Sequence, residues 1–510
     1  MALVVVLLVA ATVLLALLAA KRLYHQAYER PPNFPPGPPR LPIWGSYWLL
    51  LLENYHFMHK ATLSMARRYN TNLLGLFLGQ FPTVVATSYE HVRTILTSKE
   101  FAARPDIIQV RARAFGERLG IFFSDGHPWL EQKRFMLRNM RDFGFGRRFQ
   151  RMEEVLHEEV GDLVALARGE WTDEAAMKDG CMKFPTALYP SMINVLWMMI
   201  AGQRFPRDQY DVLRAIAEAS NKFVQSVDQL GGAVAQTPWL ANIAPEATGL
   251  PETVRNSKHL SDTVKNALED HERTYSEDHL RDFIDRYIQE MRKLGTTKEL
   301  SFSDKQLQLV AGDLLVAAPT TTSSTLTFAV RALLYHPEVQ RRSQEELDRV
   351  VGRDRLPTLD DRFNLPYTEA IIRETLRYNT LLPLALPHLA AEDTTLGGYD
   401  IPKNTIVICN LHAVHHDKEL WGDPQNFRPE RFLDDHGKLK RDITLPFGTG
   451  KRLCPGETFS RQGMFVVLAA LLQNFNLEPK DRSTLPPIDH AINGLSLTPN
   501  FMWVRMIPRD

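Results

Sequence analysis

The sequence has few cysteines and no excess of charge of either sign. Only three cysteines occur among its 510 residues, Cys181, Cys409 and Cys454. An odd and sparse set argues against a disulfide framework and favours a reducing compartment. The 60 basic and 60 acidic side chains give a formal net charge of zero, so the overall charge does not indicate a nucleic-acid partner. Any electrostatic partner site must therefore be local.

Internal repeats and Gly/Ser-rich linkers are also missing from the sequence, so nothing divides it into several domains. The apolar fraction of 44% is ample for one large core. A proline-rich segment, residues 31–39, cannot form a helix and predicts a stiff, extended spacer. We therefore expect an N-terminal membrane anchor at residues 1–22, a proline-rich hinge at 23–45 and one domain at 46–510.

One long apolar run is present, at the N-terminus. Residues 2–20 are a nineteen-residue run interrupted only by Thr12, and Lys21 and Arg22 follow it. As a helix this run would span about 28 Å, close to the hydrocarbon thickness of a bilayer. A cleavable signal peptide is the alternative, but its basic n-region is missing and its apolar run would be shorter. The basic residues after the run predict a retained anchor with the rest of the chain on the cytoplasmic side.

The remaining pattern is mostly helical. Strand-like stretches occur at Leu74–Phe77, Thr83–Ala86 and Thr405–Cys409. A capping sequence at Ser303 begins a helix that is expected to reach Tyr335, a length of roughly 45 Å. Residues 225–260 are expected to be irregular. The fold class that we expect is mainly α with small β-sheets.

A single cysteine stands in a glycine-rich loop near the C-terminus, Phe447-Gly-Thr-Gly-Lys-Arg452-Leu-Cys454-Pro-Gly456. The glycines at 448, 450 and 456 permit positive φ and close approach of the backbone to a bulky group. The apolar stretch 457–472 predicts a helix, whose N-terminal end, with Arg452, favours a thiolate. These features suit a cysteine that binds a metal through sulfur, although a lone cysteine is more often buried and inert.

This loop matches Phe-x-x-Gly-x-Arg-x-Cys-x-Gly without a gap and resembles the haem-binding loop of the cytochrome P450 family. Glu374-Thr-Leu-Arg377 and Pro429-Glu-Arg431-Phe432 precede it in the family's order. The resemblance implies the P450 fold, haem b as cofactor and Cys454 as the thiolate ligand of its iron. It also implies that Phe447, Arg452 and Gly456 contact the haem, and that Glu374, Arg377 and Arg431 form a structural ion network.

The resemblance implies three further haem-binding residues. Trp129 and Lys133 lie four apart on a helix that begins near Pro128, so they share a face. The family has arginine where Lys133 stands, and lysine keeps the charge but loses the bidentate fork. His388 follows a segment that lies over the haem in the resembled fold and would reach a propionate, with a core histidine as the alternative.

The long helix departs from the family pattern at Ala317-Ala318-Pro319-Thr320-Thr321. Alanine replaces the expected glycine and Thr320 replaces the acid, while Thr321 keeps the hydroxyl; in the family the acid and alcohol feed protons to bound dioxygen. We expect Thr320 and Thr321 to be the catalytic residues. Since Pro319 lacks an N–H, we expect a kink and a free Leu315 carbonyl that holds a relay water with the threonines.

The resemblance implies a monooxygenase that receives electrons from NADPH-cytochrome P450 reductase, with cytochrome b5 as a further candidate donor, at the endoplasmic reticulum membrane. Residues 225–260 fall where the family places a membrane-dipping access loop. The candidate face for an acidic donor is basic and includes Lys133, Arg134, Arg138, Arg141, Arg147, Arg148 and Lys451. The expected substrate is a lipophilic small molecule, because the presumed lining is apolar: Phe122, Val316, Leu381, Leu382, Leu384 and Leu386.

Two other functions remain open at this point. A haem-thiolate isomerase or dehydratase acting on a lipid hydroperoxide needs neither reductase nor proton relay, and the missing acid favours it. A non-catalytic haem protein that binds a lipophile is the second alternative. Neither the substrate nor the site of oxidation on it follows from the sequence.

Overall fold

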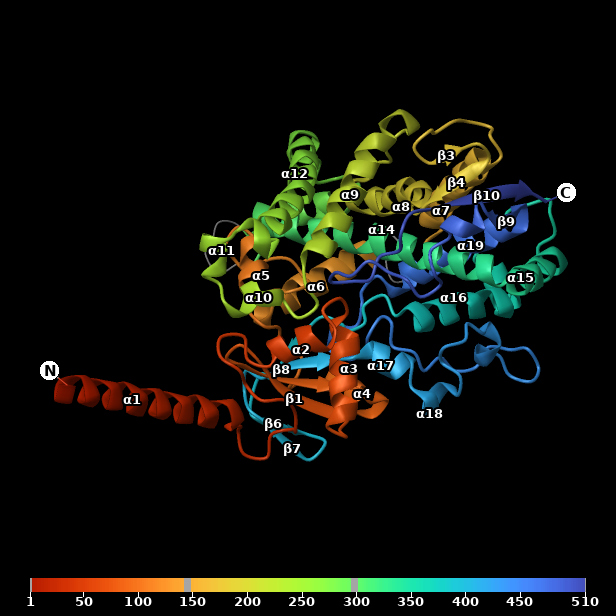
Figure 1. Cartoon of the computed structure of the whole chain (residues 1–510). Coiled ribbons are helices and arrows are strands. Elements are labelled where there is room, and N and C mark those ends of the chain that lie inside the picture. Colours follow the sequence, from red (N-terminus) through yellow and green to blue (C-terminus); the bar gives the residue numbers. More distant parts are fainter. Residues whose placement is uncertain (1, 142–147, 295–300, 510) are drawn as a thin grey trace. The chain divides into compact units, whose positions relative to one another are not determined.

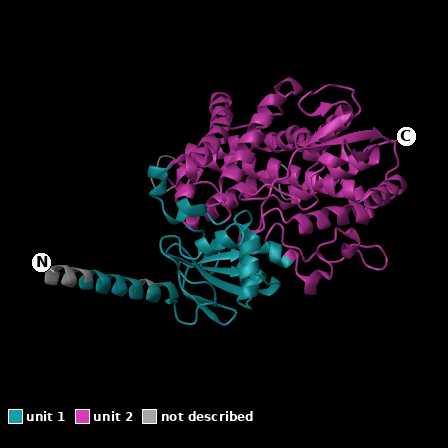
Figure 2. Cartoon of the chain, viewed as in Figure 1, with its two compact units in different colours: residues 1–105, 230–244, 384–414 teal, residues 106–229, 245–383, 415–510 magenta. Residues whose placement is uncertain are grey.

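The computed structural model describes residues 2–141, 148–294 and 301–509. The chain forms two compact units, each assembled from three separate stretches of sequence (Figure 2). Unit 1 comprises residues 1–105, 230–244 and 384–414, and unit 2 comprises residues 106–229, 245–383 and 415–510.

Unit 1 is built on a four-stranded sheet with the strand order β1-β2-β8-β5. The first two strands, β1 (Leu73–Leu78) and β2 (Phe81–Ala86), pair antiparallel across a tight turn. The third, β8 (Ile406–Cys409), pairs parallel with β2, and β5 (His388–Leu389) closes the sheet. The strands predicted at 74–77, 83–86 and 405–409 are confirmed.

Helices and a small hairpin complete unit 1 (Figure 1). Its helices are α1 (Ala2–Tyr28), α2 (Tyr47–Glu53), α3 (Met58–Arg68), α4 (Tyr89–Thr97), α10 (Gly232–Gln236) and α11 (Leu240–Ile243), and α17 (Leu411–His415) begins in it. The hairpin is β6 (Thr394–Leu396) with β7 (Tyr399–Ile401). Among the residues described, no helix has both the length and the apolar character that a membrane span requires.

The proline-rich segment is fastened to strand β1 within unit 1. Arg30 donates hydrogen bonds to the carbonyl oxygens of Pro35, Gly37, Pro38 and Gly75, at 2.6–3.1 Å. Gly75 and Gly37 lie so close that a Cβ on Gly37 would stand 1.9 Å from the Gly75 carbonyl oxygen. The segment therefore packs along the strand, which the prediction of a spacer did not include.

Unit 2 is mainly helical. Its helices are α5 (Ile108–Ala112), α6 (Gly126–Arg141), α7 (Gln150–Ala167), α8 (Tyr189–Ala201), α9 (Tyr210–Ser226), α12 (Leu250–Thr274), α13 (Phe283–Leu294), α14 (Asp304–Tyr335), α15 (Pro337–Val350), α16 (Pro366–Asn379), α18 (Lys418–Trp421) and α19 (Glu457–Asn474). A second sheet has the order β3-β4-β10-β9, with bounds Met177–Lys178, Cys181–Phe184, Met502–Pro508 and Phe475–Pro479. Within residues 225–260, the short helices α10 and α11 and the first half of α12 are regular, so the expectation that this whole stretch is irregular is wrong for those parts.

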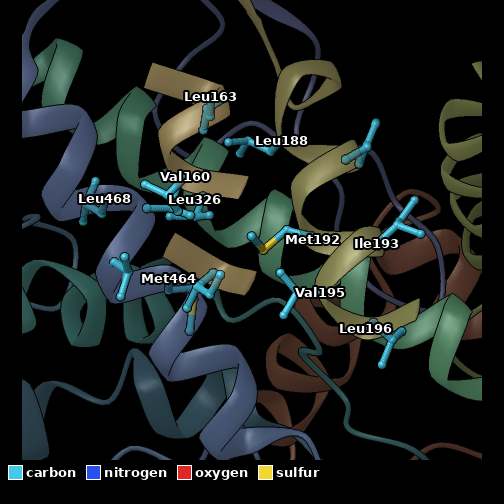
Figure 3. Close-up of a cluster of buried hydrophobic side chains, with 14 of the residues drawn as sticks. Val160, Leu163, Leu188, Met192, Ile193, Val195, Leu196, Leu326, Met464 and Leu468 are labelled. Atoms are coloured by element: carbon cyan, nitrogen blue, oxygen red, sulfur yellow. The ribbon is translucent and has the colours of Figure 1, made fainter. Parts of the chain in front are cut away.

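The long helix α14 is the centre of unit 2, and α8, α9, α12, α16 and α19 pack against it (Figure 1). Its start is fixed by the side chain of Ser303, which accepts a hydrogen bond from the N–H of Gln306, and its end by His336 before Pro337. Both predicted boundaries are confirmed. Figure 3 shows part of the apolar core, in which side chains of α7, α8 and α19 pack together with those of α14.

The predicted ion network is present and fully buried. Arg377 donates from Nε and Nη2 to the two carboxylate oxygens of Glu374, at 2.7 and 2.8 Å. Arg431 donates to the same carboxylate at 3.0 Å, from the short 3₁₀ helix η5 (Pro429–Phe432). The side chains of Glu374 and Arg377 are 0% exposed and that of Arg431 4%. This network joins α16 to the chain that leads into the cysteine loop.

Candidate active site

The cysteine loop is held in one shape by its glycines and by a backbone hydrogen bond. Gly448 and Gly450 have φ of 69° and 71°, values that favour glycine, whereas Gly456 has φ of −88°. Gly448 and Gly450 therefore adopt the positive φ that the sequence permits, and Gly456 does not. The N–H of Cys454 donates to the carbonyl oxygen of Phe447 at 2.9 Å and closes the loop. Helix α19 begins directly after it, at Glu457.

The Cys454 thiol has the surroundings of a metal ligand. Burial, together with the nearby Glu457 carboxylate, raises its pKa to about 11, and the backbone N–H groups of Gly456 and Glu457 and the Lys133 ammonium oppose that effect. At neutral pH the isolated thiol therefore keeps its proton. A bound cation such as iron would displace the proton and leave the thiolate with two backbone N–H groups directed at its sulfur. The donor set therefore suits a metal–thiolate bond.

Three of the predicted haem-binding residues meet beside this loop. The Arg452 guanidinium stacks on the Trp129 ring, with its Cζ 3.5 Å from the ring centroid. The Lys133 ammonium lies 5.4 Å from the same centroid and donates to the carbonyl oxygen of Lys451. Burial lowers the pKa of Arg452 to about 10, so the side chain stays charged at neutral pH. The result is a partly buried cationic cluster next to the cysteine, which fits the carboxylates of a haem; that role stays a prediction.

Two residues that hold Arg452 were missed in the sequence. Its Nη1 and Nη2 both donate to the carbonyl oxygen of Ser124 at 3.1 Å, and Nη2 also donates to Asp125 at 3.1 Å. These residues stand 327 and 328 positions earlier in the chain, just before α6. No local pattern links them to the loop, and the sequence offered no signal for the contact.

The middle of α14 carries the two predicted catalytic threonines. Around it nearly every residue is buried, but Ala317, Ala318 and Thr321 are partly exposed on one face. Thr320 and Thr321 each donate a 2.6 Å hydrogen bond to the carbonyl oxygen four residues earlier. Both hydroxyl oxygens keep acceptor capacity, but Thr320 is 2% exposed, whereas Thr321 lies on the partly exposed face. A small-residue face of this kind leaves room for a bulky planar group.

Helix α14 continues through Pro319, and the Leu315 carbonyl freed by the proline is not left free. Ser220 of α9 reaches it with its hydroxyl at 3.1 Å, while the same hydroxyl lies 2.8 Å from the carbonyl oxygen of Ile216. The expectation of a free carbonyl that holds a relay water is therefore wrong. The proline instead creates an acceptor on α14 that a side chain of α9 occupies.

A hydrogen bond ties the threonine stretch to the helix that follows the cysteine loop. The hydroxyls of Thr322 on α14 and Ser460 on α19 are 2.9 Å apart and buried. Ser460 lies three residues after the first residue of α19. The two parts of the predicted site are thus joined within unit 2.

His388 belongs to unit 1, whereas the other predicted site residues belong to unit 2. It is 2% exposed, and its Nδ1 is 2.7 Å from the carbonyl oxygen of Phe101, so Nδ1 carries a proton. Its contact with a haem propionate stays a prediction. Of the presumed lining residues, Phe122, Leu381 and Leu382 are partly exposed in unit 2, whereas Leu384 is packed in the core of unit 1.

Comparisons with known proteins identify the family of the chain. The family model for cytochrome P450 matches residues 35–504. The chain is 34% identical to farnesoate epoxidase of Bombyx mori, covering 93% of this chain and 94% of that protein. It is 34% identical to probable cytochrome P450 305a1 of Drosophila melanogaster, covering 94% and 95%, and 33% identical to cytochrome P450 2C25 of Mesocricetus auratus, covering 95% and 96%. The chain therefore belongs to the cytochrome P450 family and is a haem-thiolate monooxygenase.

Proposed function

We propose that this monooxygenase inserts one oxygen atom from dioxygen into a lipophilic small molecule, at the endoplasmic reticulum membrane, with electrons from NADPH through the cytochrome P450 reductase. The observation that carries the proposal is the buried hydrogen bond between Thr322 and Ser460, which joins the threonine stretch of α14 to the helix that follows the Cys454 loop. The partly exposed apolar residues Phe122, Leu381 and Leu382 support a lipophilic substrate. Haem b is the proposed cofactor, and N-terminal residues 1–22 are the proposed anchor.

The bound haem would supply dioxygen binding and activation, and the chain would supply its ligand, its orientation and protons. Cys454 would give the thiolate, which favours O–O cleavage. Trp129, Lys133 and Arg452 would hold the carboxylates. Water bound to the Thr320 and Thr321 oxygens would deliver protons.

Asp313, the acid that precedes the threonines on α14, does not take the place of the acid that the family has at position 320. Asp313 is 0% exposed and accepts hydrogen bonds from Arg113 and from the N–H groups of Ile121 and Phe122, at 2.6–3.1 Å. Both of its carboxylate oxygens thus accept hydrogen bonds from the segment that precedes α6. Proton delivery in this proposal therefore depends on water and hydroxyls.

The proposed electron donor would dock on the exposed basic face of α6. Arg134, Arg138 and Arg141 are exposed and spaced by four and three residues, so they share one face. Arg148 is instead neutralised by Glu153 and Asp360, and Arg147 lies outside the described residues. The docking face proposed here therefore comprises Arg134, Arg138, Arg141 and the exposed Lys451.

Reversing the charge at Arg138 and Arg141 together, as Arg138→Glu with Arg141→Glu, is expected to slow reduction by the reductase about 10-fold at low salt. The difference should shrink as salt screens the attraction. Stopped-flow reduction of the haem iron measures this. The pair Arg255→Glu with Lys265→Glu on α12 makes the same change in net charge elsewhere and should leave the rate unchanged. Equal reduction rates for the two double variants would exclude this face of α6 as the docking site of the electron donor.

The isomerase alternative is tested by supplying lipid hydroperoxides without reductase or NADPH. The proposed function predicts no rearranged product above that of free haem. Rapid rearrangement under these conditions would show that the loss of the acid at position 320 accompanies a change of reaction.

A further inference from the structure

A cavity in unit 2 reaches helix α14 just after the predicted catalytic threonines. It has a volume of about 320 Å³, and its wall combines residues of β4, α8, α9, α14 and the segment that precedes β10. Glu218 and Lys222 of α9 form an exposed ion pair on this wall, whereas Tyr189 and Ser324 on the same wall are buried. The cavity therefore leads from solvent to a buried face of α14. Its size is sufficient for several water molecules.

The hydroxyl of Ser324 is available to water, unlike most of its neighbours on α14. The threonines of the stretch 320–327 donate to a backbone carbonyl one turn earlier, except Thr322, which pairs with Ser460. In this stretch, all of which the structure describes, only Ser323 and Ser324 have hydroxyls without a hydrogen-bond partner. Of these two, Ser324 lines the cavity. A buried hydroxyl without a partner on a cavity wall is a typical binding point for ordered water.

Polar groups of α8 and α9 line the same cavity and complete the partners that water needs. The amide of Asn221 donates to the phenol oxygen of Tyr189 at 2.7 Å, which leaves the phenol hydrogen to bind water. Burial raises the pKa of Tyr189 to about 12, so the phenol keeps this hydrogen at neutral pH. Thr186 adds another buried hydroxyl. With Ser324, these groups provide the two to four polar contacts that hold a buried water molecule.

Ser324 lies one helical turn from both predicted catalytic threonines. It follows Thr320 by four residues and Thr321 by three, so its side chain lies between theirs on the helix surface. Residues at these spacings have Cβ atoms about 5–6 Å apart, a distance that one water molecule bridges between two hydroxyls. Water in the cavity can thus be connected to the threonines through Ser324, without a carboxylic acid in between.

We propose that Ser324 orients the water of this cavity toward Thr320 and Thr321, and that protons reach the site through this water in place of the acid that the family has at position 320. The inference rests on the proposed function and names the proton source of its site. A proton enters from solvent and passes from water to water. The Ser324 oxygen accepts one proton and releases its own to the water beside Thr321, so the hydroxyl is unchanged after each transfer. Ser324 is therefore a positioning residue, which acts through the threonines.

Crystals of the haem-loaded full-length protein test the inference without turnover, because the ligand is water. The wild-type protein should show an ordered water within hydrogen-bond distance of the Ser324 hydroxyl and a continuous file of waters from there to Thr321. Ser324→Ala should lose the water at this position, and Ser324→Thr should keep it. A dry cavity in the wild-type protein, or an identical file of waters in Ser324→Ala, would overturn the inference.

Coupling of NADPH consumption to oxygen insertion gives the second readout, with reductase and the compound of a lipophilic panel that the wild-type protein oxidises fastest. Ser324→Ala should form about 10-fold less product per NADPH, release more hydrogen peroxide and show a larger solvent isotope effect in D₂O. Ser324→Thr keeps a hydroxyl at the same place, so it should restore the coupling to within about twofold of the wild-type value.

Ser323→Ala is the matched control, because Ser323 is the adjacent buried serine, its hydroxyl also has no partner, and it does not line this cavity. It should leave coupling and the isotope effect within about twofold of the wild-type values. Unchanged coupling in Ser324→Ala, an equal loss in Ser323→Ala, or a loss that Ser324→Thr does not restore would each contradict the inference. A wild-type protein that contains the file of waters but oxidises no compound of the panel would instead contradict the proposed function alone.

Discussion

Replacing Cys454 by serine is expected to abolish oxygen insertion, with a loss on the order of 10³-fold or more, because the hydroxyl cannot replace the electron-rich thiolate that favours O–O cleavage. The structure gives the sulfur two backbone N–H groups and the start of α19, a setting that supports a negative charge when iron is bound. The absorption spectrum of the reduced carbon monoxide complex reports thiolate ligation directly. It should lose its haem-thiolate band in Cys454→Ser.

The other two cysteines provide matched controls. Cys181 and Cys409 are 1% and 0% exposed, and neither lies in the predicted site. Burial raises the pKa of the Cys409 thiol to about 12, so it remains a neutral core side chain. Cys181→Ala and Cys409→Ala should keep the thiolate band and activity within about twofold, at a cost in stability near 1 kcal/mol each. A Cys454→Ser protein that retained the thiolate band would contradict the assignment of the ligand.

Replacing Glu374 by glutamine is expected to destabilise the fold by about 3–5 kcal/mol, because two buried guanidinium groups would lose their shared carboxylate. Glu374 accepts from Arg377, from Arg431 and from the N–H of Arg428. A loss of this size is a large part of the stability of an ordinary protein. Thermal unfolding of the haem-loaded protein and the amount of haem retained after purification both measure it.

Glu430→Gln is the matched control for this effect. Glu430 stands in the same short helix as Arg431, but it binds Arg342 in a pair whose side chains are 37% and 51% exposed. Exposed ion pairs contribute about 0–1 kcal/mol, so this variant should unfold close to the wild-type temperature. If both variants lost the same stability, the buried network would not be the structural element proposed here.

The parts of the molecule that were predictable depend on signals that are local in the sequence. Ser303 caps α14 through a residue three positions away, and Pro337 starts α15, so both boundaries could be placed. Phe447 and Cys454 belong to one ten-residue pattern, and the structure joins them by a hydrogen bond. The short apolar runs of β1 and β2 are buried on both faces or nearly so, which made them recognisable as strands.

The parts that were missed depend on contacts between distant residues. Ser220 and Leu315 are 95 positions apart, and Arg113 and Asp313 are 200 apart. A proline predicts that a carbonyl loses its helical partner, but it does not say which side chain takes that place. Asp313 did leave a signal, since an acid in an otherwise apolar stretch of helix needs a buried partner. Its partner could not be identified without the fold.

The most direct test of the account supplies heavy-isotope dioxygen to the membrane-expressed protein with reductase, NADPH and a panel of lipophilic small molecules. Mass spectrometry of the product gives the number and source of the oxygen atoms inserted. The account predicts one heavy oxygen per product molecule, dependent on NADPH and lost in Cys454→Ser. A product that forms without NADPH, or whose new oxygen does not come from dioxygen, would contradict it.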